Sequence, residues 1–246
     1  MAISDKPEII FKDQSILAVN KPAGISVIHD SHHPQIPSLK EQLEAEFGQL
    51  WVVHRLDRDT SGIMLFARDK NIHRWLNNQF QAREVIKRYH LLACGAFSWH
   101  KIQVKSPLRV NGDRQHRTII DFREGKPAQT DFEILQAFDH AIFFVLAIPH
   151  SGYTHQIRAH LSSLNGYILN DPLYRPHPYP HNSIDTYNIS PCKSWISQNL
   201  PIQRLALHAS EITFRHPSYQ DSISIHAPYP GDFSQSLDWL KTTGQE

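Results

Sequence analysis

The sequence is poor in cysteine and has no long apolar run, and both shortages narrow the class of protein. Its 246 residues include two cysteines, Cys94 and Cys192, so nothing favours a disulfide framework. The longest apolar run, residues 141–148, is far too short to cross a bilayer. The N-terminus lacks the basic-then-apolar pattern of a secretory signal. We therefore expect a cytoplasmic globular protein with no membrane partner.

Net charge is also nearly absent, at +1, but the charge is unevenly distributed. Residues 51–126 carry 15 lysines and arginines against 7 acidic residues, whereas residues 1–50 carry 4 against 7 and the remainder 6 against 10. A basic middle between acidic ends can form one positive face on a nearly neutral protein. This pattern favours nucleic-acid binding, although an unevenly charged solvated surface would give the same counts.

Short apolar stretches separated by turns predict more strands than helices. Ser38 and Glu41 form a capping box that begins a helix, and Asp69 can cap a second one. Helices are expected over about 38–47, 69–80 and 154–164, with a last one starting near residue 232. Strands are expected over about 9–11, 16–19, 62–67, 85–94, 102–105, 129–138, 141–148, 205–209, 211–214 and 222–225. The pattern predicts an α+β fold with a largely antiparallel mixed sheet and flanking helices.

The most informative stretch is HRLDRDTSG, residues 54–62. An acidic residue between two arginines often forms a surface ion-pair cluster. Here, however, the cluster lies between the apolar residues 51–53 and a buried strand, so the loop is expected to lie against the core. Neighbouring guanidinium groups would keep Asp57 ionised. A carboxylate held in this way can act as a nucleophile or as a base.

This stretch and five others resemble the RluA-type pseudouridine synthases, which modify large-subunit ribosomal RNA and tRNA. The other five, in family order, are NKPAG at 20–24, KRY at 87–89, GKPAQT at 125–130, HQIRAH at 155–160, and LHA at 207–209 with HP at 216–217. They lie in a region of about residues 9–228. The resemblance implies the catalytic fold of that family, with a central RNA-binding cleft, and an isomerase that needs no cofactor.

The resemblance also implies catalytic roles for three residues. Asp57 would attack the anomeric carbon of uridine or remove the 2′-proton of the sugar. Tyr89 would pack against uracil and assist loss of the proton from carbon 5, although a plain core aromatic would fit the same pattern. Arg158 would pair with Asp57 and keep it charged, whereas its alternative is a phosphate-contacting or surface arginine.

The target atoms are inaccessible in stacked RNA, so the uridine must be flipped out of the helix. The resemblance implies that Arg55 fills the vacated stack, for which a planar guanidinium is suited. Its alternative is plain phosphate binding. Further RNA-contacting or loop-shaping residues are expected to be His54, Arg58, Thr60, Ser61, Gly62, Lys87 and Lys21.

Two departures from the family pattern affect expectations near Arg158. Residues 151–153 read SGY where the family has TGR, so a basic contact is missing at Tyr153. Asn170 replaces a glycine before Asp171, and asparagine tolerates a positive φ better than most residues. We therefore expect this turn to be kept.

The whole chain, 1–246, is expected to form a single catalytic domain without a separate N-terminal RNA-binding domain. Residues 171–203 contain six prolines and predict a long insertion. The 17 histidines suggest no metal site, since neither residues 29–33 nor residues 150–160 combine them with a completing cysteine or carboxylate. The expected partner is structured RNA, and the protein is expected to be a monomer.

Two alternatives stay open. One is a non-catalytic RNA-binding protein on the same fold, which predicts loss of Asp57 or Tyr89; both are present. The other is an N-glycosidase in which Asp57 and Asp59 supply the acid and the nucleophile. Free uracil separates the reactions, because a glycosidase releases it and an isomerase does not.

Overall fold

The computed structural model describes residues 7–31, 34–138, 141–175, 199–219 and 221–243. The chain divides into two compact units, which we describe separately. Unit 1 comprises residues 1–89 and 208–230, and unit 2 comprises residues 90–207 and 231–246.

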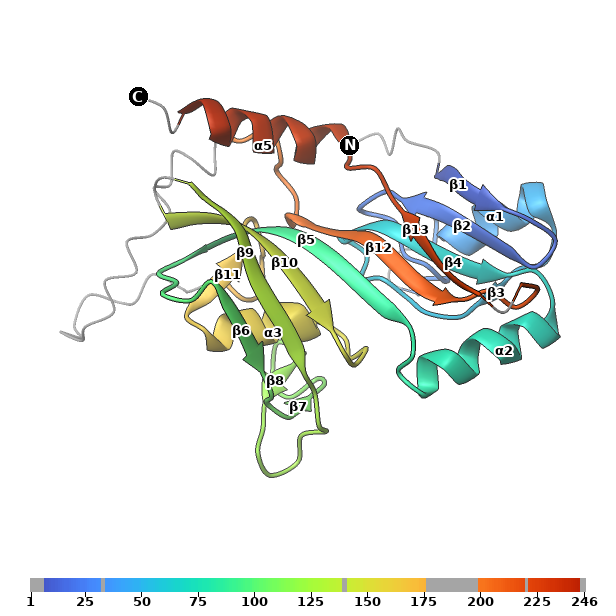
Figure 1. Ribbon diagram of the computed structural model, residues 1–246, viewed down its shortest axis with the longest axis horizontal. Coiled ribbons are helices and arrows are strands. Elements are labelled where there is room, and N and C mark those ends of the chain that lie inside the picture. The colour runs from blue at the N-terminus through green and yellow to red at the C-terminus, as the bar shows by residue number, and fades with distance from the viewer. Residues whose placement is uncertain (1–6, 32–33, 139–140, 176–198, 220, 244–246) are drawn as a thin grey trace. The chain divides into compact units, whose positions relative to one another are not determined.

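Unit 1 is a sheet flanked by two helices (Figure 1). Strand β4 (Ser61–Ala67) pairs with β2 (Ile16–Lys21) and β3 (Trp51–Val52) in antiparallel fashion and with β12 (Leu207–Arg215) in parallel. Strand β1 (Glu8–Lys12) pairs with β2, and β13 (Ser222–His226) pairs with β12, both antiparallel. The helices are α1 (Leu39–Phe47) and α2 (Lys70–Gln81). Every residue of β4 is buried, so the loop before it starts from the core.

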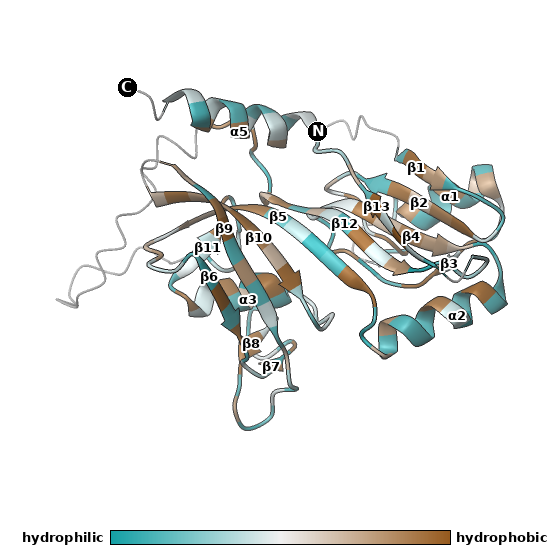
Figure 2. Ribbon diagram, in the orientation of Figure 1, coloured by the Kyte–Doolittle hydropathy of each residue, from teal (hydrophilic) through white to brown (hydrophobic). Residues whose placement is uncertain are grey.

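Local signals explain both helices of unit 1. In α1, Ser38 Oγ accepts a hydrogen bond from the N–H of Glu41, and the Glu41 carboxylate accepts one from the N–H of Ser38, which confirms the predicted capping box. In α2, Asp69 accepts from the N–H groups of Asn71 and Ile72. Helix α2 contacts β4 and β3, and Figure 2 shows both hydrophobic and hydrophilic residues along it.

Unit 2 combines an antiparallel sheet with helix α3 (Gln156–Ser163) (Figure 1). Strand β5 (Ile86–Gly95) carries the chain from unit 1 into unit 2, where the sheet order is β5, β10 (Ile142–Pro149), β9 (Thr130–Phe138) and β6 (Lys101–Val104). Strand β11 (Gly166–Ile168) pairs with β5, and the short strands β7 (Leu108–Arg109) and β8 (Ile119–Ile120) form a separate hairpin. Helix α5 (Gly231–Thr243) is the last element of unit 2 in the sequence.

The predicted α+β class with a mostly antiparallel mixed sheet is confirmed. The two strands expected at 205–209 and 211–214 were wrong, because residues 207–215 form one continuous strand, β12. Strands β3, β7, β8 and β11 were not predicted, since two or three residues are too few to show a period. An insertion was expected at residues 171–203. Most of it, residues 176–198, lies outside the described residues.

No helix among the described residues is long and apolar enough to span a membrane. The described parts of the chain also hold no group of three or more histidine, cysteine, aspartate or glutamate side chains arranged to bind a metal ion.

Candidate active site

The segment 54–60 is a loop that joins β3 to β4 and lies against the core of unit 1. Leu56 is 5% exposed and Thr60 2% exposed, so both anchor the loop. The N–H of Thr60 donates to the carbonyl oxygen of Asp57 over 3.1 Å, which closes a tight turn. Asp57 is half-buried and Arg55 is exposed. The loop therefore holds one carboxylate on a fixed turn and directs one arginine toward solvent.

The turn of residues 20–24 supports this loop from one side. The ammonium of Lys21 is completely buried and donates to the carbonyl oxygens of Pro22, Ile25 and Arg58, each over 2.9 Å. Gly24 N–H donates to the Arg58 carbonyl oxygen over 2.8 Å, and Arg58 Nε donates back to the Gly24 carbonyl oxygen over 3.1 Å. Because these three carbonyl oxygens accept the hydrogen bonds that water would otherwise accept, the ammonium can be buried here. This geometry supports a positioning role for Lys21 rather than the expected contact with RNA.

Strand β12 supports the loop from the other side. His208 Nε2 faces the carbonyl oxygen of Ala227 at 3.2 Å and therefore donates, so Nδ1 accepts from Ser61 Oγ, 3.0 Å away. Gly62 has a φ of +118°, and a Cβ there would lie 2.2 Å from the carbonyl oxygen of Ala209. Only glycine lets the two backbones approach this closely. The LHA motif thus holds the end of the loop.

The ring of His54 is packed at the start of the loop. It stacks on Phe80, with ring centroids 5.1 Å apart, and its Nε2 accepts from the N–H of Leu65 over 3.0 Å. Burial lowers the pKa of His54 to about 3, and the positive charge of Lys87 contributes to this shift. His54 is therefore neutral at physiological pH and holds the loop against β4.

Strand β5 adds two functional side chains to this neighbourhood. Lys87 and Tyr89 are two residues apart and so lie on one face of the strand, within the hydrophilic stretch of β5 that Figure 2 shows. Burial raises the pKa of the Tyr89 hydroxyl, and the negative charge of Asp57 raises it further. Burial also lowers the pKa of the Lys87 ammonium to about 8. Asp57 and Tyr89 are therefore close enough to interact, with Tyr89 in its neutral form.

The third predicted catalytic residue, Arg158, belongs to helix α3 of unit 2. Its side chain is 6% exposed and pairs with the fully buried Asp171. Arg158 Nε and Nη2 each donate to one carboxylate oxygen over 2.7 Å, and the guanidinium lies 4.9 Å from the centre of the Tyr174 ring. A bidentate pair and an aromatic face together fix both the plane and the rotation of a guanidinium.

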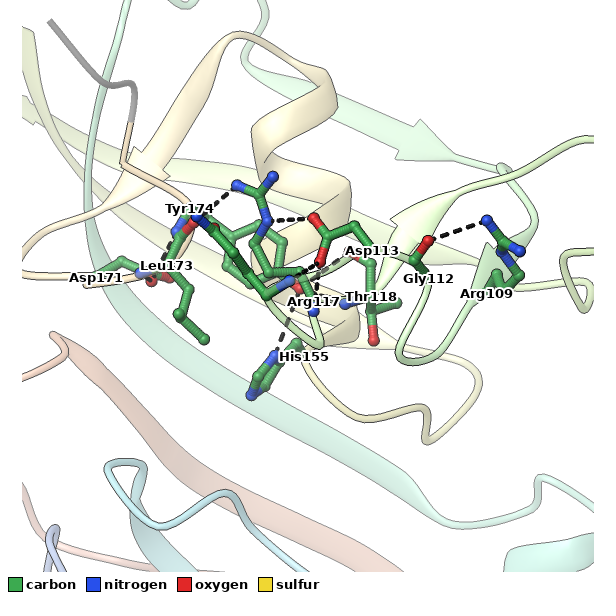
Figure 3. A network of polar contacts seen from close by, with 10 residues as sticks. Arg109, Gly112, Asp113, Arg117, Thr118, His155, Asp171, Leu173 and Tyr174 are labelled. Atoms are coloured by element: carbon green, nitrogen blue, oxygen red, sulfur yellow. Dashed lines mark hydrogen bonds and ion pairs between the residues drawn. The ribbon is translucent and has the colours of Figure 1, made fainter.

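The partners of Arg158 are themselves held in a polar network (Figure 3). Tyr174 Oη accepts from the N–H of Thr118 over 2.8 Å and donates to its carbonyl oxygen over 2.9 Å. Asp171 also accepts from the N–H groups of Leu173 and Tyr174. Arg117 donates to the Leu173 carbonyl oxygen over 3.0 Å. Burial raises the pKa of Tyr174 to about 12, so its hydroxyl stays a donor.

Buried hydrogen bonds also join the GKPAQT and HQIRAH motifs. Gln156 donates to Thr130 Oγ1 over 3.0 Å and accepts from Ser151 Oγ over 2.8 Å. His160 Nε2 faces the carbonyl oxygen of Ser106 at 3.0 Å, so its Nδ1 accepts from Thr130 Oγ1 at 2.8 Å. Burial lowers the pKa of His160, which favours this neutral form. These contacts fix helix α3 and with it Arg158.

A comparison with known protein families assigns the chain to one of them. The family model described as RNA pseudouridylate synthase matches residues 15–163, which is more than half of the chain. The chain belongs to this family.

Curated relatives agree with the assignment to RNA pseudouridylate synthases. The chain is 32% identical over 221 residues to the dual-specificity RNA pseudouridine synthase RluA of Pasteurella multocida, covering 90% of this chain and 92% of the relative. It is 35% identical over 236 residues to the ribosomal large subunit pseudouridine synthase C of Vibrio cholerae, covering 95% and 69%. Among solved structures, human RNA pseudouridylate synthase domain containing 4 has a TM-score of 0.74 at 22% identity, covering 95% and 93% of the two chains.

The predicted family, fold and enzyme class, an isomerase acting on RNA, are thus confirmed. The individual site residues stay predictions. Within unit 1, the charge of Asp57 acts on the Tyr89 hydroxyl and the charge of Lys87 acts on the His54 ring. Arg158 lies in unit 2, so its predicted pairing with Asp57, the expected single domain and the expected central cleft also stay predictions.

Both departures from the family pattern have a structural account. Asn170 has a φ of +59°, so the expected left-handed turn is kept without glycine. The ring of Tyr153 packs against the small core cluster that includes Leu108 and Ala159, and its N–H donates to Gln156. Sequence reasoning gave Asp171 and Tyr174 no role, although the retained Asp-x-x-Tyr spacing was a signal for both.

Proposed function

We propose that the protein converts uridine to pseudouridine in tRNA or large-subunit ribosomal RNA, with Asp57 as the catalytic carboxylate. The observation that carries the proposal is the electrostatic coupling of Asp57 to Tyr89 on a loop clamped from both sides. The two curated relatives described above are named for activity on RNA, and the name of the one from Vibrio cholerae specifies the large ribosomal subunit.

The reaction breaks the bond between N1 of uracil and the anomeric carbon, rotates the base, and forms a bond from that carbon to C5. In one route the carboxylate of Asp57 attacks the anomeric carbon, and in the other it removes the 2′-proton of the sugar. Both routes need an ionised carboxylate at a fixed position. The anchoring of the loop by Leu56 and Thr60 supports that requirement.

Tyr89 is proposed to pack on uracil and to assist the final proton transfer from C5. Because its pKa is raised, a phenolate base is not available near neutral pH. The hydroxyl can still accept the proton while it passes its own to a neighbouring carboxylate. Asp57 is the group that the electrostatic coupling offers for this transfer. The reaction balances because N1, which has left the sugar, takes up one proton for the one that C5 loses.

Arg55 is proposed to fill the gap that the flipped uridine leaves, in keeping with its exposure on the loop. Arg58, Ser61, Gly62 and Thr60 are proposed to shape the loop around the flipped nucleotide. His54 and Lys87 are proposed to lie near the RNA, with Lys87 as the charged contact. A cytoplasmic location and a monomeric state stay predictions from the sequence.

Asp57→Asn tests the catalytic assignment, and Asp59→Asn is its matched control. Asp59 is an exposed carboxylate two residues away on the same loop. We expect Asp57→Asn to lose pseudouridine formation by more than about 100-fold with unchanged RNA affinity, and Asp59→Asn to stay active. Mass-spectrometric nucleoside analysis of treated RNA gives the rate. Release of free uracil by the wild type would favour an N-glycosidase instead, and an active Asp57→Asn variant would contradict the assignment.

Arg55→Lys separates base flipping from phosphate binding, because lysine keeps the charge and loses the plane. Extruding a base costs about a few kcal/mol, so the variant should be slow on a stacked target uridine. It should recover partly when the uridine lies in a flexible loop. Equal rate losses on both RNAs would mean that Arg55 binds phosphate only.

A further inference from the structure

The most exposed large apolar side chain among the described residues is Phe122, which is 79% exposed. It lies in unit 2 on the turn after β8, outside the motifs that carry the family resemblance. Exposing a phenylalanine to water is unfavourable. A single exposed apolar residue is common on protein surfaces, so Phe122 points to a binding surface only together with the fixed turn and the charges around it.

The turn that carries Phe122 is built to hold one conformation. Asp121 Oδ1 accepts from the N–H groups of Arg123 and Glu124 over 2.9 and 3.0 Å. The N–H of Gly125 returns to the carbonyl oxygen of Asp121 over 2.9 Å, and the N–H of Asp121 donates to the carbonyl oxygen of Pro107 over 3.0 Å. Phe122 thus projects from a turn that is closed at both ends, so its exposure is a property of the fold.

Among the described residues near this turn, every acidic side chain is in an ion pair, whereas most of the basic side chains are not. Residues 105–126 contain six lysines and arginines against three acidic residues. Each acidic residue is already in an ion pair: Asp113 with Arg117 at 2.7 Å, and Asp121 and Glu124 with Arg109, both at 2.9 Å.

The four remaining cations of the segment are all exposed. Within the part of the chain that the structure describes, none of them forms an ion pair with a carboxylate. They are Lys105, Arg114, Arg123 and Lys126. The positive charge of Arg123 also acts on Asp121, whose carboxylate pairs with Arg109. The segment therefore combines an exposed aromatic ring with an excess of positive charge, which is a combination that recognises unpaired nucleotides in RNA.

We propose that residues 105–126 form a second RNA-contacting surface, in which Phe122 stacks on an unpaired base and the four exposed cations contact neighbouring phosphates. The preferred RNA is then a stem with unpaired nucleotides rather than a continuous duplex. The proposal rests on the proposed function for its choice of RNA, while the surface itself lies entirely in unit 2.

Substitutions at Phe122 test the stacking, with two fluorescent RNAs as probes: a stem-loop and a blunt duplex with the same stem. Base stacking on an aromatic side chain is worth about tenfold in affinity. We expect Phe122→Ala and Phe122→Leu to weaken stem-loop binding about tenfold and to leave duplex binding unchanged. Phe122→Trp should retain binding because it keeps a planar ring. Leu135→Ala, at a 43% exposed apolar residue of the same unit, is the control and should change neither affinity.

Arg123→Gln and Arg114→Gln test the charges, with Lys101→Gln as control, since Lys101 is exposed but pairs with Glu133 at 2.9 Å. Each of the first two should make the slope of log affinity against log salt shallower by about 0.7–0.9, and the control should not. Unchanged slopes would contradict the phosphate contacts.

Three outcomes would overturn the stacking proposal. They are equal affinity losses on both RNAs, full affinity in Phe122→Leu, or a change confined to the oligomeric state in light scattering, which would indicate a protein interface. Pseudouridine formation by the wild type is measured in parallel. An active wild type with unaltered binding in Phe122→Ala refutes the surface and keeps the proposed function. An inactive wild type whose stem-loop binding still depends on Phe122 refutes the function and keeps the surface.

Discussion

The loop of Asp57 in unit 1 and the surroundings of Arg158 in unit 2 hold their central residues in different ways. Around Asp57, the structure fixes the backbone: Lys21 binds the carbonyl oxygen of Arg58, and Gly62 lies against Ala209. Around Arg158, the structure fixes the side chain itself, through the carboxylate of Asp171.

The difference follows from the chemistry of the two groups. A short carboxylate side chain has few torsions, so a fixed backbone already determines where it points. A guanidinium on a long side chain must be oriented by partners at its own donors. Disturbing unit 1 should therefore displace the loop, whereas disturbing unit 2 should misorient one side chain.

The largest effect is expected from Gly62→Ala, because a Cβ would lie 2.2 Å from the Ala209 carbonyl oxygen at a φ of +118°. Strain and overpacking together should lower the free energy of unfolding by about 2–6 kcal/mol. Gly24→Ala is the control: its φ is +88°, but no atom lies within 4 Å of the added Cβ. It should cost about 1–2 kcal/mol. Urea unfolding gives both values, and equal costs would contradict the close approach.

Asp171→Asn should come next, since it leaves the buried charge of Arg158 without its anionic partner. Breaking a buried ion pair costs about 3–5 kcal/mol, and the amide oxygen recovers part of this. Asp131→Asn is the matched control in the same unit, because its pair with His150 is exposed and contributes less than about 1 kcal/mol.

The kcat and the RNA affinity of Asp171→Asn show whether Arg158 acts in catalysis or binds phosphate. If Arg158 acts in catalysis, kcat should fall while RNA affinity is kept. A loss of affinity at unchanged kcat would instead assign Arg158 to phosphate binding.

Lys21→Met should lower the free energy of unfolding by about 2–4 kcal/mol, because the carbonyls of Pro22, Ile25 and Arg58 lose a charged donor. The control is Lys12→Met at an exposed lysine, which should cost less than about 1 kcal/mol.

Kinetics of Lys21→Met distinguish the two roles considered for this residue. A positioning role lowers kcat and leaves the salt dependence of RNA binding intact. A direct phosphate contact would make the salt slope shallower by about 0.7.

The smallest effect concerns Lys87, whose pKa falls to about 8 in the folded protein from 10.5. Between these values the unfolded chain binds more protons than the folded one, so stability rises as the pH increases from 8. Relative to Lys87→Met, the wild type should therefore gain about 1 kcal/mol between pH 8 and 9. Urea unfolding of both proteins at the two pH values measures the difference, and a constant difference would show that Lys87 is solvated.

Much of the fold was predictable because its signals are local. The capping box of Ser38 and Glu41, the cap at Asp69 and the apolar run of β4 depend on residues a few positions apart. The motif that contains Asp57 could also be recognised from the sequence, since its residues are consecutive. The single strand β12 was predicted as two, because a polar residue does not end a strand whose first part pairs with β4 and whose second part pairs with β13.

The sequence by itself determined the family, the strand-rich α+β class and the identity of the loop that carries Asp57. Only the tertiary structure decided that the Lys21 ammonium is buried, that Asp171 holds Arg158, and that Phe122 projects into solvent. Spacing along the chain encodes local hydrogen bonds and periodic faces. Burial and the choice of a distant partner depend instead on how the elements pack, and a charged or aromatic residue looks the same in the sequence whether packing covers it or leaves it exposed.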